Sequence, residues 1–373
     1  PVVAEKLLFR AAASYQNSDG LITNTFLNKK ADFFEDKTGR LQATWLATEN
    51  ISVDARASLS RTDGGAVLYS QFGTTGLSNA TYIKPTENVL GESTRDMDDF
   101  SLKIDWDFGA AALTAITAYS TVKESYRGDL DFSSAQVVGQ GQDLDVDMLS
   151  QEIRLTSPND QAFRWITGAY YLRTNRDLKT TVFLDNNGTI AGFTPLFVFG
   201  NESNSNDAYA VFGQGAYDVT EKLELSAALR FDADDREQTD LLRNNAVRDK
   251  VFTKWQPKVT AKYKWTDAVM TYATYSTGFR SGGFNAPTVT PTIFAKETTT
   301  NYEAGFKATL ADGRLVLNGS AFHTKLKNAQ IFKVDLSAGA QIIDNVRRAN
   351  LNGLELEAQA RLAQGWDLFG GLG

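Results

Sequence analysis

The stretch that most constrains the fold of this chain is residues 98–119, in which apolar and polar side chains alternate one by one from Phe100 to Phe108. Every second residue from 100 to 108 is apolar, and the residues between are polar or charged: Phe100, Leu102, Ile104, Trp106 and Phe108 alternate with Ser101, Lys103, Asp105 and Asp107. Successive side chains of a β-strand point to opposite faces of the sheet, so this pattern predicts a strand with one apolar and one polar face. We expect a tight turn at Gly109, after which the chain runs back.

The same alternation recurs along the whole chain. Its clearest repeats lie at residues 51–60, 223–232, 258–265 and 354–362. No stretch of comparable length favours the 3.6-residue period of a helix. The sequence therefore predicts an all-β fold of about fifteen strands.

The connections between these expected strands alternate between short and long. Short turns are expected at 47–51, 107–111, 157–162, 219–223, 265–269, 310–315 and 363–367, and long polar connections at 16–37, 61–97, 123–146, 176–205, 237–250, 280–297 and 329–347. Outer-membrane barrels have this asymmetry, with short periplasmic turns and longer extracellular loops. The pattern predicts a transmembrane antiparallel up-and-down β-barrel, whose apolar rows face lipid and whose polar rows face a wide lumen.

A soluble antiparallel sheet with one solvated face is the main alternative to a membrane barrel. Fifteen successive strands exceed what open twisted sheets usually tolerate, and Greek-key sandwiches mix their long and short connections at both ends. Apolar residues make up 42% of the chain, yet no apolar run approaches the ~18 residues of a transmembrane helix. The net charge is −7 and no dense basic stripe is visible in the sequence, so nucleic acid is not an expected partner.

The inventory of reactive side chains argues against an enzyme. The chain has no cysteine, and its only histidine is His323. Without a second histidine or a cysteine we expect no zinc catalysis, no metal site and no cofactor. His323 lies in an alternating strand, where a lone histidine is more often a structural residue than the base of a Ser-His-Asp triad. The acidic repeat of Asp143, Asp145 and Asp147 lacks the glycine and glutamate of a calcium-binding loop. We expect it to belong to a strand whose inner face is acidic.

Two of the long connections contain side chains suited to contacting a ligand. Aromatic residues in the connection 61–97 can stack on sugars or on the rings of an iron chelator, or pack in the loop or at the membrane interface. An arginine at a barrel mouth can attract an anionic cargo or pair with a loop carboxylate. The candidate ligand-binding residues of the extracellular loops are Tyr69, Phe72, Tyr82, Arg280 and Phe284.

Several stretches of the second half resemble the barrel of TonB-dependent outer-membrane receptors. The most specific are "YATYSTGFRSGGFN" (272–285) and "ETTTNYEAGFK" (297–307), and "RRANLNGLELEAQARLAQGWDLFGGLG" (347–373) continues the likeness. The opening "VVAEKLLFRAAASYQNSDGLITNTF" resembles an early barrel segment of the same family. The resemblance implies a barrel of about 22 strands around an N-terminal plug. Residues 1–373 would then be a partial barrel domain, without the plug, the first strands and the last strands.

The resemblance also implies a function. It predicts TonB-dependent import of a scarce nutrient across the outer membrane of a Gram-negative bacterium, with an iron–siderophore complex as the default cargo and vitamin B12 or an oligosaccharide as alternatives. The expected partners are the TonB complex, outer-membrane lipid and the small or metal-chelate ligand, and the receptor is expected to be a monomer. A passive porin and a soluble all-β carbohydrate-binding protein are the competing interpretations.

Overall fold

The computed structural model of the chain describes residues 6–66, 84–184, 194–286, 289–335 and 340–373. Within these ranges every regular element is a β-strand. No described segment forms a helix long and apolar enough to cross a bilayer. Fifteen strands make one sheet, paired antiparallel in chain order, as the alternation predicts.

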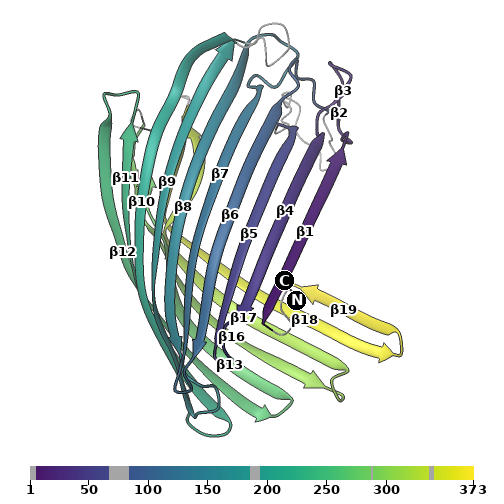
Figure 1. Ribbon diagram of the computed structural model, residues 1–373, viewed down its shortest axis with the longest axis vertical. Coiled ribbons are helices and arrows are strands. Elements are labelled where there is room, and N and C mark those ends of the chain that lie inside the picture. Colours follow the sequence, from purple (N-terminus) through teal and green to yellow (C-terminus); the bar gives the residue numbers. More distant parts are fainter. Residues whose placement is uncertain (1–5, 67–83, 185–193, 287–288, 336–339) are drawn as a thin grey trace.

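The large sheet runs from β1 at one edge to β19 at the other, and it curves strongly: β13 and β16 to β19 cross behind β1 to β9 in Figure 1. Two short hairpins, β2 with β3 and β14 with β15, lie outside the sheet. The strands of the sheet are β1 Leu7–Ser18, β4 Phe34–Leu46, β5 Ile51–Gly65, β6 Glu92–Asp107, β7 Ala112–Asp129, β8 Val138–Thr156, β9 Phe163–Leu184, β10 Thr194–Asp218, β11 Leu223–Asp240, β12 Ala246–Thr266, β13 Val269–Arg280, β16 Glu297–Leu310, β17 Leu315–Asp335, β18 Ala340–Ala363 and β19 Trp366–Leu372. The hairpin strands are β2 Thr23–Asn24, β3 Lys29–Lys30, β14 Gly283–Phe284 and β15 Ile293–Phe294.

The seven short turns occur where the sequence places them, and because the sheet is an antiparallel meander they all lie at the same end of the wall. The turn between β6 and β7 contains Gly109 with a φ of 84°, a conformation that side chains with a Cβ rarely adopt. The expectation that one end of the barrel has short turns and the other has long connections is therefore confirmed.

Most of the long connections are shorter than the sequence predicts, although the one expected at 280–297 occupies residues 281–296. Of the expected connection 123–146, only residues 130–137 lie between β7 and β8, and β11 and β12 likewise extend through most of 237–250. The longest strand, β10, has 25 residues, whereas about 9–11 residues cross a bilayer. The strands therefore continue beyond the membrane, and the polar composition of these outer parts reflects strands with water on both faces.

The outer face of the wall carries a band bounded by aromatic residues. Near the short turns lie Trp106, Phe108, Phe163, Tyr217, Tyr263 and Trp265. Eight residues further along β9, β10 and β12 lie Tyr171, Tyr209 and Trp255, in a second row that also contains Tyr119, Phe231, Tyr275 and Tyr302. The second row contains contacting pairs, such as Phe231 with Trp255 at a ring-centre distance of 4.7 Å. Eight residues of strand span about 26 Å, which matches the apolar band and aromatic girdles of membrane barrels.

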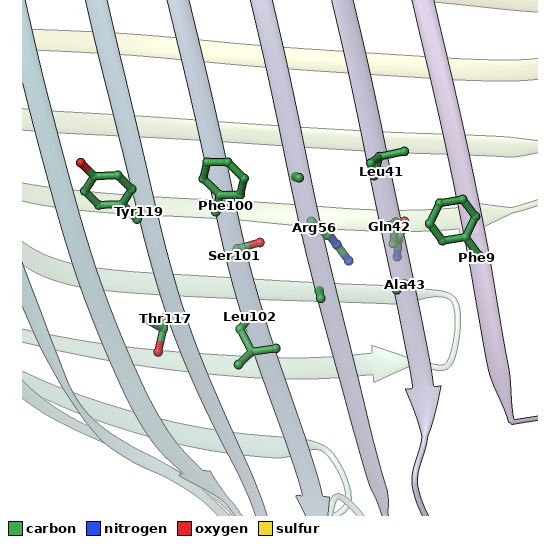
Figure 2. A pocket seen from close by; sticks show the side chains of 12 residues that line it. Phe9, Leu41, Gln42, Ala43, Arg56, Phe100, Ser101, Leu102, Thr117 and Tyr119 are labelled. Carbon is green, nitrogen blue, oxygen red and sulfur yellow. The ribbon is translucent and has the colours of Figure 1, made fainter.

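The apolar row from Phe100 to Phe108 lies on this outer face. Its five side chains are between 37% and 49% exposed, which does not fit the soluble sandwich that would bury them. Beside Phe100 the outer wall has a hollow of about 450 Å³, formed where β5 presents only Ala55 and Ala57. Figure 2 views this hollow from outside, with Phe9 and Leu41 on one side of β5 and Phe100 and Tyr119 on the other. The small alanines and large flanking side chains give the lipid-facing wall an uneven surface.

Candidate functional site

The structure describes two of the five sequence-predicted ligand contacts. Tyr69, Phe72 and Tyr82 lie outside the described residues. Arg280 is the last residue of β13 and faces Glu297 of β16 across the strand pair, and Phe284 lies in β14. The Glu297 carboxylate accepts a hydrogen bond from the backbone N–H of Gln330 at 2.7 Å. Both described candidates therefore lie at the extracellular mouth, around the connection between β13 and β16.

The described residues of that connection, 281–286 and 289–296, fold over the lumen face of β12. The outer face of β12 is marked by Trp255, so Arg248 and Phe252 project from its other face, into the lumen. Arg248 donates a hydrogen bond to the carbonyl of Asn285 at 2.9 Å, and its guanidinium lies 5.4 Å from the ring centre of Phe284. A Cβ at Gly282 would lie 2.4 Å from the Phe252 ring, so this close approach requires glycine. The Phe284 ring is thus in contact with the Arg248 guanidinium, and this contact helps to hold the hairpin in place.

Three side-chain amides fasten the same connection to neighbouring strands. Asn285, only 6% exposed, donates to the carbonyl of Ile343 at 2.8 Å and accepts from its N–H at 2.9 Å. Asn345 makes the equivalent pair of bonds with Ala295, at 2.7 and 3.0 Å, and Gln330 donates to the carbonyl of Ser281 at 2.7 Å. Each amide satisfies backbone groups that a strand partner would otherwise bind. The hairpin is therefore fixed across the mouth, and sequence alone gave no signal for these contacts.

A hydrogen-bonded cluster of partly buried polar groups lies beside the hairpin on the lumen face. Gln238 of β11 donates to Glu202 of β10 at 2.9 Å and to Asn204 at 3.0 Å, and it also accepts from Arg248. Burial raises the pKa of Glu202, and burial lowers the pKa of Arg248. These residues lie well beyond the band between the aromatic girdles. The cluster links β10, β11 and β12 to the hairpin through Arg248.

The loops at the other side of the mouth are also packed together. Asn24 is fully buried, donates to the carbonyl of Glu87 at 2.8 Å and accepts from the N–H of Phe26 at 3.0 Å. The N–H of Asn88 donates to the carbonyl of Ser133 at 3.0 Å. These contacts join the connections β1–β4, β5–β6 and β7–β8. The β5–β6 connection is the one that contains the aromatic candidates Tyr69, Phe72 and Tyr82.

The expectation of an acidic inner face at 143–147 is wrong. Asp147 accepts a hydrogen bond from the hydroxyl of Tyr119 at 2.8 Å, and Asp143 accepts two from Arg127 at 2.8 and 2.9 Å. Tyr119 belongs to the outer face, so the aspartates of this repeat lie outside the barrel wall, above the apolar band. The described residues contain no group of three metal-ligating side chains placed to hold a metal ion.

His323 lies on the outer face as well. Its ring is stacked beside that of Tyr302 with centres 6.4 Å apart, and its Nδ1 is 2.6 Å from Oδ1 of Asn352. It therefore extends the upper aromatic row, which agrees with the interpretation of a lone histidine in a strand as a structural residue.

The known proteins that this chain resembles are β-barrels, in agreement with this geometry. The sequence model of the family described as "TonB dependent receptor-like, beta-barrel" matches residues 59–373. The pesticin receptor of Yersinia enterocolitica is 31% identical over 115 residues, which are 29% of this chain and 16% of that protein.

Two solved structures have the same fold over essentially the whole chain. The ferric yersiniabactin uptake receptor of Yersinia pestis aligns with a TM-score of 0.78 at 18% identity, covering 100% of this chain and 57% of the receptor. The ferripyoverdine receptor of Pseudomonas aeruginosa aligns with a TM-score of 0.76 at 16% identity, covering 99% and 52%. The chain thus spans little more than half the length of these receptors, and at this identity the likeness concerns the fold.

Proposed function

Because this chain belongs to the TonB-dependent receptor β-barrel family, whose members are transport receptors of the Gram-negative outer membrane, we propose that it is part of a receptor that imports an iron–siderophore complex. In this proposal residues 1–373 supply fifteen strands of a barrel of about 22, and the plug and the contacts with TonB belong to the rest of the receptor. The extracellular loops capture the cargo, and TonB-driven movement of the plug releases it inward.

The observation that carries this proposal is the family match over 59–373. Two further features support it. The solved receptors of the same fold are described as taking up ferric yersiniabactin and ferripyoverdine. The hairpin of β14 and β15 is fixed across the lumen side of β12 through Asn285, where an incoming ligand would meet it. Arg280 and Phe284, and the aromatic residues Tyr69, Phe72 and Tyr82, remain the proposed ligand contacts.

The test is iron uptake by cells that produce the full-length receptor as their only route for ferric chelates. We expect the receptor to support accumulation of radioactive iron from at least one siderophore complex, and deletion of TonB to abolish it. Equal uptake with and without TonB would indicate a passive porin and overturn the proposal. Uptake of vitamin B12 or an oligosaccharide in place of every ferric chelate would overturn the choice of cargo.

A further inference from the structure

The lumen face of β12 carries a row of cationic side chains and no anionic one. Alternation along the strand puts six cations on this face: Arg248, Lys250, Lys254, Lys258, Lys262 and Lys264. Successive lumen-facing positions are about 7 Å apart, so the row follows the wall from the mouth to the end with the short turns. The row is inconspicuous in the sequence because valine, threonine, tryptophan and tyrosine of the outer face separate its members.

The carboxylates beside the middle of this row are paired with other cations. On β11 Asp232, which lies directly opposite Lys254, is bound by Arg230 at 2.7 Å, and Asp234 is bound by Arg236 at 2.9 Å. On β13 the side chain directly opposite Lys258 is Ser276. The two ends of the row have counter-charges: Lys262 binds Glu224 at 2.7 Å at the lower end, and Arg248 at the upper end lies near Glu202 and Asp240. Among the described residues, no carboxylate lies within ion-pair distance of Lys250, Lys254 or Lys258.

Unneutralised lysines in a concave wall create a positive potential that is stronger than on an open surface, because low-dielectric walls focus the field. A water-filled lumen does not by itself require an excess of positive charge, since the lumen face of β11 carries both positive and negative side chains. The hairpin of β14 and β15 lies over the upper end of the row, where Arg248 binds the carbonyl of Asn285 and Gly282 lies against Phe252. Lys250 lies between Arg248 and Phe252 on this face, and Lys254 and Lys258 are the next cations along the row.

We propose that the lumen face of β12 is an anion-binding track, with Lys250, Lys254 and Lys258 receiving the carboxylate or catecholate oxygens of an anionic ferric chelate after it passes the hairpin. This inference rests on the proposed function and names its substrate class. Charge-assisted hydrogen bonds from lysine to such oxygens are short and strong, and neighbouring lysines can bind one cargo together.

The test uses the full-length receptor purified in detergent. Binding of three probes is followed by intrinsic fluorescence: ferric enterobactin, an anionic tris-catecholate complex; ferric citrate, an anionic carboxylate complex; and ferrioxamine B, a cationic hydroxamate complex. We expect tighter binding of an anionic probe, and an affinity that falls as salt is added. Receptor that binds ferrioxamine B more tightly, or that binds neither ferric enterobactin nor ferric citrate, would overturn the inference.

The variant Lys254→Gln/Lys258→Gln should bind ferric enterobactin at least about tenfold more weakly, and Lys254→Arg/Lys258→Arg should retain binding. The matched control is Lys123→Gln/Lys179→Gln, which removes two cations from the outer face of β7 and β9. Unchanged affinity in the lumen variant would refute the track. If that variant instead makes the receptor's own plug sensitive to protease at unchanged affinity, the row binds the plug and the inference is wrong.

The two proposals fail in different ways. TonB-dependent iron uptake by a receptor that binds only neutral or cationic chelates would leave the proposed function standing and remove the anion track. Absence of TonB-dependent iron uptake would remove the proposed function itself.

Discussion

Arg248 of β12 holds Phe284 of β14 through its guanidinium, which lies 5.4 Å from the centre of the phenyl ring. The same guanidinium donates a hydrogen bond to the carbonyl of Asn285, the residue that follows Phe284. One lumen-facing side chain therefore positions two consecutive residues of the hairpin over the mouth. Because it also binds Gln238, it connects the hairpin to the polar cluster on β10 and β11.

Arg248→Ala should loosen the hairpin without preventing barrel assembly. The loss of a cation–π contact and of hydrogen bonds from a charged donor corresponds to roughly 1–3 kcal/mol of local stability. We expect faster amide hydrogen exchange across the described residues of 281–296. Arg243→Ala is the control, because Arg243 binds Asp240 in the turn between β11 and β12. Unchanged exchange in Arg248→Ala would show that the amide contacts alone hold the hairpin.

Asn285→Ala should release the hairpin from β18. The substitution leaves the N–H and carbonyl of Ile343 without their present partners, and a buried unpaired polar group costs about 1–3 kcal/mol. We expect the amide of Ile343 to exchange at least about tenfold faster. Asn352→Ala, on the outer face of the same strand, should leave that amide protected. Protection of Ile343 in both variants would contradict this role of Asn285.

The raised pKa of Glu202 predicts how the local stability of the mouth depends on pH. Burial raises its pKa above the ordinary value of 4.5, so between 4.5 and the raised value the folded mouth holds a proton that the opened mouth releases. Local stability should therefore be highest at low pH and fall as the pH rises through this window. Glu202→Gln should flatten this part of the profile, as measured by hydrogen exchange of β10 and β11 at several pH values. An unchanged slope in Glu202→Gln would assign the dependence to another group.

The fold could be predicted because its determinants are local. Alternation at Phe100 to Phe108 defines a strand and its faces, and short turns such as that at Gly109 define which end is which. The ends of the strands could not be predicted, since beyond the bilayer both faces meet water and the alternation disappears. The repeat at Asp143 does alternate, but beyond the bilayer its polar residues face outward instead of inward, and only the register with Tyr119 shows this.

The candidate site was less predictable because its contacts join distant segments. The sequence placed Arg280 and Phe284 at a barrel mouth, which the structure confirms as a location. It gave no sign that Arg248 would bind Phe284, or that Asn285 would reach Ile343, because no local period links residues in different loops. The cationic row of β12 is inconspicuous in the sequence for another reason: its lysines alternate with outward-facing residues and form a row only when the two faces of the strand are known.

Two adjacent residues of β6, Leu102 and Ser101, test the assignment of the two faces of the wall. Leu102 faces outward between the two aromatic rows, and Ser101 faces the lumen. Leu102→Arg should reduce barrel stability by about 2–4 kcal/mol, because a cation on the lipid face near the bilayer midplane is costly. Ser101→Arg adds the same side chain to a wet surface and should change stability little. Assembly of the full-length receptor in the outer membrane, followed by its heat-modifiable migration in gels, distinguishes the two variants. Equal tolerance of both, or greater damage from Ser101→Arg, would mean that the apolar row is not the lipid-facing one.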